Sequence, residues 1–196
     1  MKKISADRSK SYNTVRTIKE VVMLHVIENT VNGSAVRTYT PSCIDQDRTE
    51  ITISDLSRGA QLTLWSIRRW VRNRSDSRSE GPSIHAVFAK SGINNEAAEI
   101  LSELLTLLSV IGIRRVRIQH ISASHLTGDE VLILRVLRWL QVGQRKTGSL
   151  GIARLVRCDL ANAFCRIGEA YAAVLAKHNL SFDMITNLSL VETSSN

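Results

Sequence analysis

The chain has 196 residues, which is enough for one substantial hydrophobic core. Hydrophobic residues make up 43% of it and charged residues 22%, a composition typical of folded globular proteins rather than of disordered or membrane-embedded chains. Its longest apolar stretches are shorter than the roughly 20 residues of a membrane helix, so no membrane association is expected. The formal net charge is +8 and arginine dominates the basic residues, which favours an acidic partner.

The ends of the chain differ in composition from its middle. Residues 1–16 are polar and basic and are predicted to form a mobile arm, while residues 189–196 are predicted to be a disordered tail. Residues 17–188 are expected to form a single helical domain. Three cysteines leave one unpaired in any disulfide pattern, and the N-terminus lacks the apolar region of a secretory signal. Both observations favour a cytoplasmic location.

The sequence aligns with itself at an offset of 70 residues. The stretch ITISDLSRGAQLTLWSIR, which begins at Ile51, falls on ISASHLTGDEVLILRVLR, which begins at Ile121, with six identical positions. This alignment predicts two related helical units of about 70 residues, over 51–120 and 121–188.

Apolar periodicity predicts the helices in chain order. The segment 17–33 has the β-branched content of a strand and the length of a helix, so its class stays open. A helix follows Leu56, with an apolar stripe formed by Ala60, Leu64, Ile67 and Val71. Further helices are expected over 96–111, 129–142 and 159–177, and short strands over 51–53 and 116–121. Thr127 and Glu130 have capping-box spacing at the start of the second of these helices, which should be central and buried.

These elements predict an all-α fold, an irregular or orthogonal helical bundle centred on the last three helices. The helix over 159–177 also carries a face of small residues, which allows another helix to approach closely. Internal packing is the favoured use of this face, and a homodimer contact is the alternative. The face consists of Ala161, Cys165, Gly168, Ala172 and Ala176.

Charge is distributed unevenly along the chain. Residues 58–80 contain six arginines and two acidic residues, and residues 114–157 contain nine basic and two acidic residues, whereas acidic residues outnumber basic ones over 19–55. Clustered guanidinium groups beside an indole can contact phosphates while the indole stacks on a base. The alternative is that Trp65 packs beneath another helix and that the arginines pair with surface carboxylates. The candidate residues for binding nucleic acid or an acidic protein are Trp65, Arg68, Arg69, Arg72, Arg74, Arg114, Arg115, Arg117, Arg154 and Arg157.

Other functional classes receive less support from the residues. A helix-turn-helix can be sketched in the second unit, but its supposed reading helix after Asp159 is rich in alanine and poor in cations. Cys158 and Cys165 lack the spacing of zinc ligands and are better explained as structural thiols, and no catalytic motif accompanies His120 or His125. No cofactor, metal or catalytic residue is predicted.

The sequence thus favours a non-enzymatic regulatory protein that binds nucleic acid through arginine-rich helical surfaces. The alternative is a protein–protein interaction adaptor or an assembly subunit of a cytoplasmic complex, and an enzyme ranks third.

Overall fold

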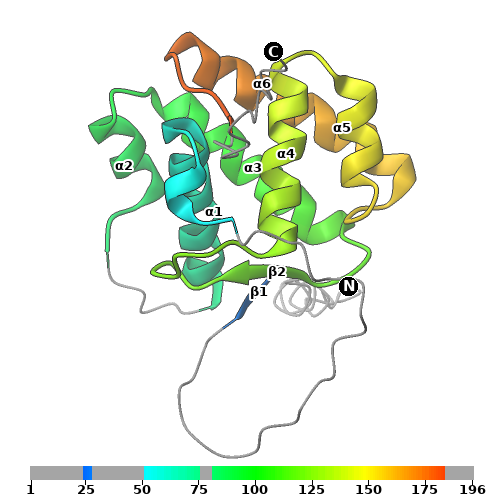
Figure 1. Ribbon diagram of the computed structural model, residues 1–196, viewed down its shortest axis with the longest axis horizontal. Helices are drawn as coiled ribbons and strands as arrows, with labels where there is room; N and C mark the ends of the chain where they lie inside the picture. Colours follow the sequence, from blue (N-terminus) through cyan, green and yellow to red (C-terminus); the bar gives the residue numbers. More distant parts are fainter. Residues whose placement is uncertain (1–23, 28–50, 76–80, 184–196) are drawn as a thin grey trace, which may run out of the picture.

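The computed structural model describes residues 24–27, 51–75 and 81–183, which contain six α-helices and one pair of short strands (Figure 1). The prediction of an all-α helical bundle is confirmed. In chain order the elements are β1 (Leu24–Ile27), η2 (Ile53–Asp55), α1 (Arg58–Ser75), α2 (Ile84–Lys90), α3 (Asn95–Ile111), β2 (Val116–Gln119), α4 (Gly128–Gln141), α5 (Arg145–Ile152), η3 (Cys158–Leu160) and α6 (Ala161–Lys177).

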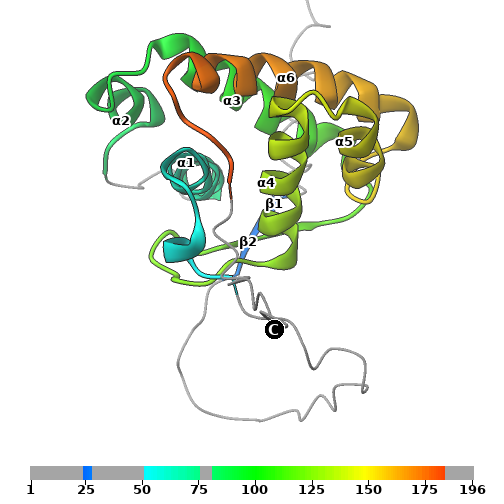
Figure 2. The same ribbon diagram turned by 45° about the horizontal axis from the view of Figure 1, so that its top comes forward.

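The helices form two layers above the strand pair. Helices α3 and α6 lie side by side in one layer, and α1 and α4 cross beneath them toward β1 and β2 (Figure 2). Helix α5 packs against α4 and α6. Buried apolar side chains from Leu56 to Phe182 form one continuous hydrophobic cluster, to which both predicted units contribute. That the two units are related in structure stays a prediction.

Local signals place the helix ends as expected. Helix α3 begins after Asn94, whose side chain makes no capping hydrogen bond, and ends at Ile111, directly before Gly112. At the start of α4 the hydroxyl of Thr127 accepts a hydrogen bond from the Glu130 N–H at 3.1 Å, and the Glu130 carboxylate accepts one from the Thr127 N–H at 2.8 Å. The predicted capping box is therefore confirmed, and α4 packs against α1, α5, α6 and β2 as the predicted central helix.

The strand pair lies at the end of the molecule where α1 and α4 meet it (Figure 1). Strand β1 lies inside the segment 17–33, whose class the sequence left open, and it runs parallel to β2 with Leu24 opposite Val116. The strand expected over 116–121 is confirmed for its first four residues. The strand expected over 51–53 is reduced to one antiparallel bridge between Thr52 and His125, because the chain turns into η2 at Ile53.

The small-residue face of α6 is used inside the fold. Ala161, Cys165, Gly168 and Ala172 are buried, and Ala176 at the end of the helix is exposed. A Cβ added to Gly168 would lie 2.7 Å from Cδ1 of Leu140, so the missing side chain lets α4 approach α6. Internal packing is thus confirmed, and the alternative of a homodimer contact through this face is wrong.

Some predictions fall on other parts of the chain. The arm over 1–16 and the tail over 189–196 lie outside the described residues. Among the helices of the described ranges, none has both the length and the apolar character needed to cross a membrane.

Candidate nucleic-acid interface

Two segments that are distant in the sequence meet side by side, and five of the candidate arginines lie in them or within a few residues of them. Gly112 forms an antiparallel bridge with Val156, and the N–H of Ile113 donates to the carbonyl of Leu155 at 2.9 Å. The chain from 111 to 113 therefore lies against the chain from 155 to 157. We call the candidate arginines in and beside these two segments the basic surface, which consists of Arg114, Arg115, Arg117, Arg154 and Arg157, all exposed.

Strand β2 orients part of the basic surface. Val116 and Ile118 are completely buried, whereas Arg117 between them is exposed. Because successive side chains of a strand point to opposite faces, the side chain of Arg117 points away from the side on which Val116 and Ile118 are buried. Arg115, just before the strand, is exposed as well.

Asp129 in the first turn of α4 neutralises one arginine of this surface. Its two carboxylate oxygens accept hydrogen bonds from the guanidinium of Arg114 at 2.7 and 2.8 Å, and one of them also accepts the backbone N–H of Arg117 at 2.8 Å. Burial alone would raise the pKa of Asp129, but the hydrogen bonds from Arg114 and Arg117 outweigh it and lower that pKa below its ordinary value. Asp129 is therefore the buried counter-ion of Arg114.

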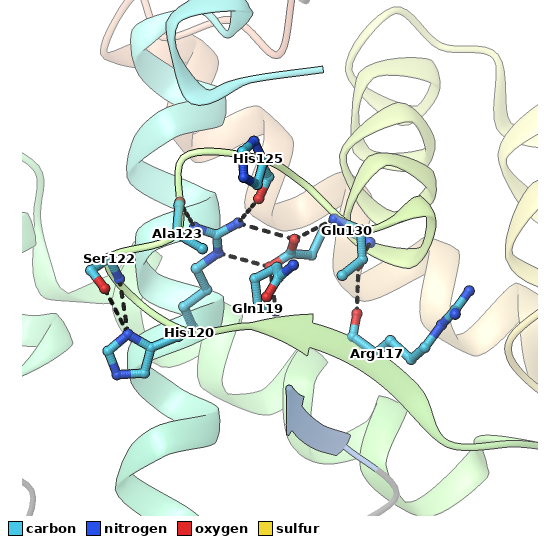
Figure 3. A network of polar contacts seen from close by, with 9 residues as sticks. Arg117, Gln119, His120, Ser122, Ala123, His125 and Glu130 are labelled. Atoms are coloured by element: carbon cyan, nitrogen blue, oxygen red, sulfur yellow. Dashed lines mark hydrogen bonds and ion pairs between the residues drawn. The ribbon is translucent and has the colours of Figure 1, made fainter. Parts of the chain in front are cut away.

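Glu130, the next residue, is committed to a different arginine. Its oxygen Oε1 accepts from Arg68 Nε at 2.8 Å and from the Gln119 N–H at 3.1 Å. Oxygen Oε2 accepts from Arg68 Nη2 at 3.1 Å and from the Thr127 N–H at 2.8 Å. Figure 3 shows Glu130 at the centre of this network, between β2 and the turn that precedes α4.

Arg68 was predicted to contact nucleic acid, and the structure corrects this prediction. The residue is 2% exposed, and two further N–H groups donate to the carbonyl oxygens of Ala123 and His125 at 2.6 and 2.9 Å. Arg69 is also unsuitable for a surface contact, because it is 5% exposed and donates to the carbonyl of Gly81 at 2.8 Å. The turn before α4 and the chain around Gly81 cover the side of α1 that helical periodicity had assigned to solvent.

Arg72 and Arg74, the other candidate arginines of α1, contact different groups. Arg72 donates to Nε2 of His120 at 2.7 Å, just beyond the end of β2. Since a guanidinium only donates, His120 accepts through Nε2, and its Nδ1 faces the Ser122 hydroxyl at 2.8 Å. Arg74 lies over the ring of Trp70 at 4.3 Å, in a cation–π contact.

Trp65, the indole expected to stack on a base, lies on α1 and not on the segments that carry the basic surface. It is half-buried in a cleft between α1 and α2. The prediction that one helix presents an indole and three guanidinium groups together to nucleic acid is therefore wrong.

Three arginines of the basic surface keep their charge unpaired within the described part of the chain. Arg114 is neutralised by Asp129, and Arg157 forms an exposed ion pair with Asp159 at 2.9 Å. Arg115, Arg117 and Arg154 form no ion pair with any carboxylate of residues 51–75 and 81–183. Asp129 and Glu130 are buried and already accept hydrogen bonds from Arg114, Arg68 and backbone N–H groups, so they do not pair with these three guanidinium groups.

The two cysteines of the described residues differ in their surroundings, and no metal site is found among these residues. Cys165 is buried, as expected of a structural thiol, and burial raises the pKa of this thiol; Cys158 is exposed, so the same explanation does not hold for it. Over residues 51–75 and 81–183, no three histidine, cysteine, aspartate or glutamate side chains lie close enough to hold a metal ion.

Sequence reasoning missed the part that Asp129 and Glu130 play as buried counter-ions. The capping-box spacing identified Glu130 as a helix-starting residue, but its pairing with Arg68 spans 62 positions and left no local signal. No protein-family model, curated protein or solved structure matches the chain. Function is therefore inferred from the chain's own residues.

Proposed function

We propose that this protein is a non-enzymatic, cytoplasmic regulatory protein that binds nucleic acid through the phosphate backbone, with the basic surface as the contact. The observation that carries the proposal is that Arg115, Arg117 and Arg154 are exposed and lack a carboxylate partner among the described residues, although Asp129 and Glu130 lie in the adjacent first turn of α4. A surface that keeps its nearby carboxylates buried and paired presents net positive charge to an incoming polyanion.

The side chains suit phosphates better than base edges. A guanidinium presents several donors in a planar fork that matches phosphate oxygens. No helix among the described residues carries these three arginines, because Arg117 lies on β2, Arg115 directly before it, and Arg154 in the turn after α5. The proposed binding is therefore positioning contact with little sequence discrimination.

The test is fluorescence anisotropy of the full chain, freed of nucleic acid, with short duplex and single-stranded oligonucleotides over a salt series. Neutralising phosphates releases counter-ions, so the logarithm of the affinity falls linearly with the logarithm of the salt concentration. In the variant Arg115→Gln, Arg117→Gln, Arg154→Gln, we expect weaker binding to every sequence and a salt slope reduced by about 3.

A matched control removes three exposed cations from the helices α2, α4 and α6, in Lys90→Gln, Arg135→Gln, Lys177→Gln. This variant has the same net charge as the first one, so an effect of total charge would appear in both. Equal losses in the two variants, or no binding by the unmodified protein at low salt, would overturn the proposal.

One observation favours the alternative of a protein-interaction adaptor. Ile113 is 55% exposed and directly precedes Arg114, and Leu150 on α5 is 77% exposed close to Arg154 in the sequence. Apolar side chains beside unpaired cations also suit an acidic protein partner. Such a partner would depend on Ile113 and Leu150 as well as on the arginines, whereas phosphate binding would tolerate Ile113→Ser and Leu150→Ser.

A further inference from the structure

A cleft of about 560 Å³ lies between α1 and α2, on elements other than those of the basic surface. The first half of α1 forms one wall, the helix α2 with its flanking residues forms the other, and the chain after α6 closes one end. Figure 1 shows α1 and α2 next to each other, with the end of α6 above them. The volume of the cleft falls in the range of roughly 300–1,000 Å³ that is usual for small-molecule sites.

The end of the cleft is built by a turn after α6. Asn179 adopts a left-handed conformation with φ of 59°, and the N–H of Leu180 returns to the carbonyl of Leu175 at 3.0 Å. The backbone carbonyl of the next residue, Ser181, accepts a hydrogen bond from the hydroxyl of Ser57, which directly precedes α1. These contacts attach the chain after α6 to the start of α1, so the cleft is formed before any ligand binds.

The cleft is lined by apolar side chains and by the exposed guanidinium of Arg58. Trp65 is half-buried in it, together with the apolar side chains of Leu62, Val87, Ile93 and Leu180. Arg58 and His178 contribute the basic groups, and none of the described lining residues is a carboxylate. Arg58 also lies in the first turn of α1, where the helix dipole favours negative charge.

We propose that this cleft binds a small organic acid with an apolar, flat or branched body. The body contacts the Trp65 indole and the aliphatic walls, and the carboxylate meets the guanidinium of Arg58. A neutral molecule of the same shape would keep the apolar contacts and lose the charge-assisted hydrogen bond. The cleft thus constitutes a ligand site separate from the proposed nucleic-acid contact.

The test compares two probes of matched shape, naphthalene-2-carboxylate and its neutral carboxamide, by calorimetry and tryptophan fluorescence on the full chain. We expect saturable binding at up to millimolar concentration, with the acid favoured about three- to tenfold because an exposed ion pair contributes modestly. Arg58→Gln should abolish this preference, and Trp65→Ala should weaken both probes. Arg58 is exposed, so its substitution leaves the fold intact, which circular dichroism checks.

The control is the variant Arg115→Gln, Arg117→Gln, Arg154→Gln, which removes the unpaired cations of the basic surface. The preference for the acid should survive in it, and this result is independent of whether nucleic acid binds. The proposal is overturned if acid and amide bind equally, if the preference persists in Arg58→Gln, or if neither probe binds saturably.

Discussion

Replacing Glu130 by glutamine keeps the volume of the side chain and removes its charge. Four donors converge on the carboxylate, two from Arg68 and one each from the N–H groups of Gln119 and Thr127. The amide offers one oxygen, so two donors lose their acceptor and face an NH₂ group instead. The guanidinium, with a side chain 1% exposed, also loses its counter-charge. We expect a loss of about 3–5 kcal/mol in the free energy of unfolding, the usual cost of removing one partner of a buried pair.

The measurement is urea denaturation followed by far-UV circular dichroism, with linear extrapolation to water. The matched control is Glu103→Gln on the exposed face of α3, which should change stability by less than about 0.5 kcal/mol. Adding Arg68→Met to Glu130→Gln removes the stranded charge, so the double variant should be more stable than the sum of the two single losses implies. A cost below about 1 kcal/mol for Glu130→Gln would refute the description of this pair as buried and mutually dependent.

Two further predictions, one with a matched control substitution, test the packing and the electrostatics. A Cβ at Gly59 would collide with the carbonyl oxygen of Ser181, so Gly59→Ala should cost about 1–3 kcal/mol in thermal denaturation, whereas Gly128→Ala, where a Cβ meets no atom within 4 Å, should be neutral or stabilising. Asp129→Asn should cost about 2 kcal/mol at neutral pH. Because folding lowers the pKa of Asp129, its stabilisation is present above the unfolded pKa of about 3.9 and is lost as the pH falls through the folded pKa. The stability gap between the variant and the unmodified chain should therefore close in acid, and a gap that persists there would contradict this role for Asp129.

Local signals were sufficient for much of the fold. The capping box of Thr127 and Glu130 places the start of α4 within one residue, and Gly112 places the end of α3. These signals work because the groups that satisfy a helix end lie within a few residues of it in the sequence. The buried stripe from Ala60 to Val71 on α1 follows from periodicity in the same way.

Contacts between distant segments could not be predicted in this way. Periodicity assigned Arg68 to the exposed side of α1, because it carries no information about the turn before α4 that covers this side. The basic surface depends equally on a distant contact, the bridge between Gly112 and Val156. The sequence thus identified arginine-rich stretches correctly, while only the tertiary fold distinguishes the two buried arginines of α1, Arg68 and Arg69, from the exposed ones in and around β2.

The hydrogen bonds between β2 and α4 also bear on the protein's resistance to aggregation. The N–H groups of Arg117 and Gln119 are occupied by the carboxylates of Asp129 and Glu130, and the carbonyl of Arg117 accepts from the Thr127 hydroxyl at 2.6 Å. The first turn of α4 thereby takes the place of a third strand along this edge. An open edge would be a template for pairing with another chain. Here the start of a helix occupies this edge of β2, and within the part of the chain that the structure describes no further strand pairs with it.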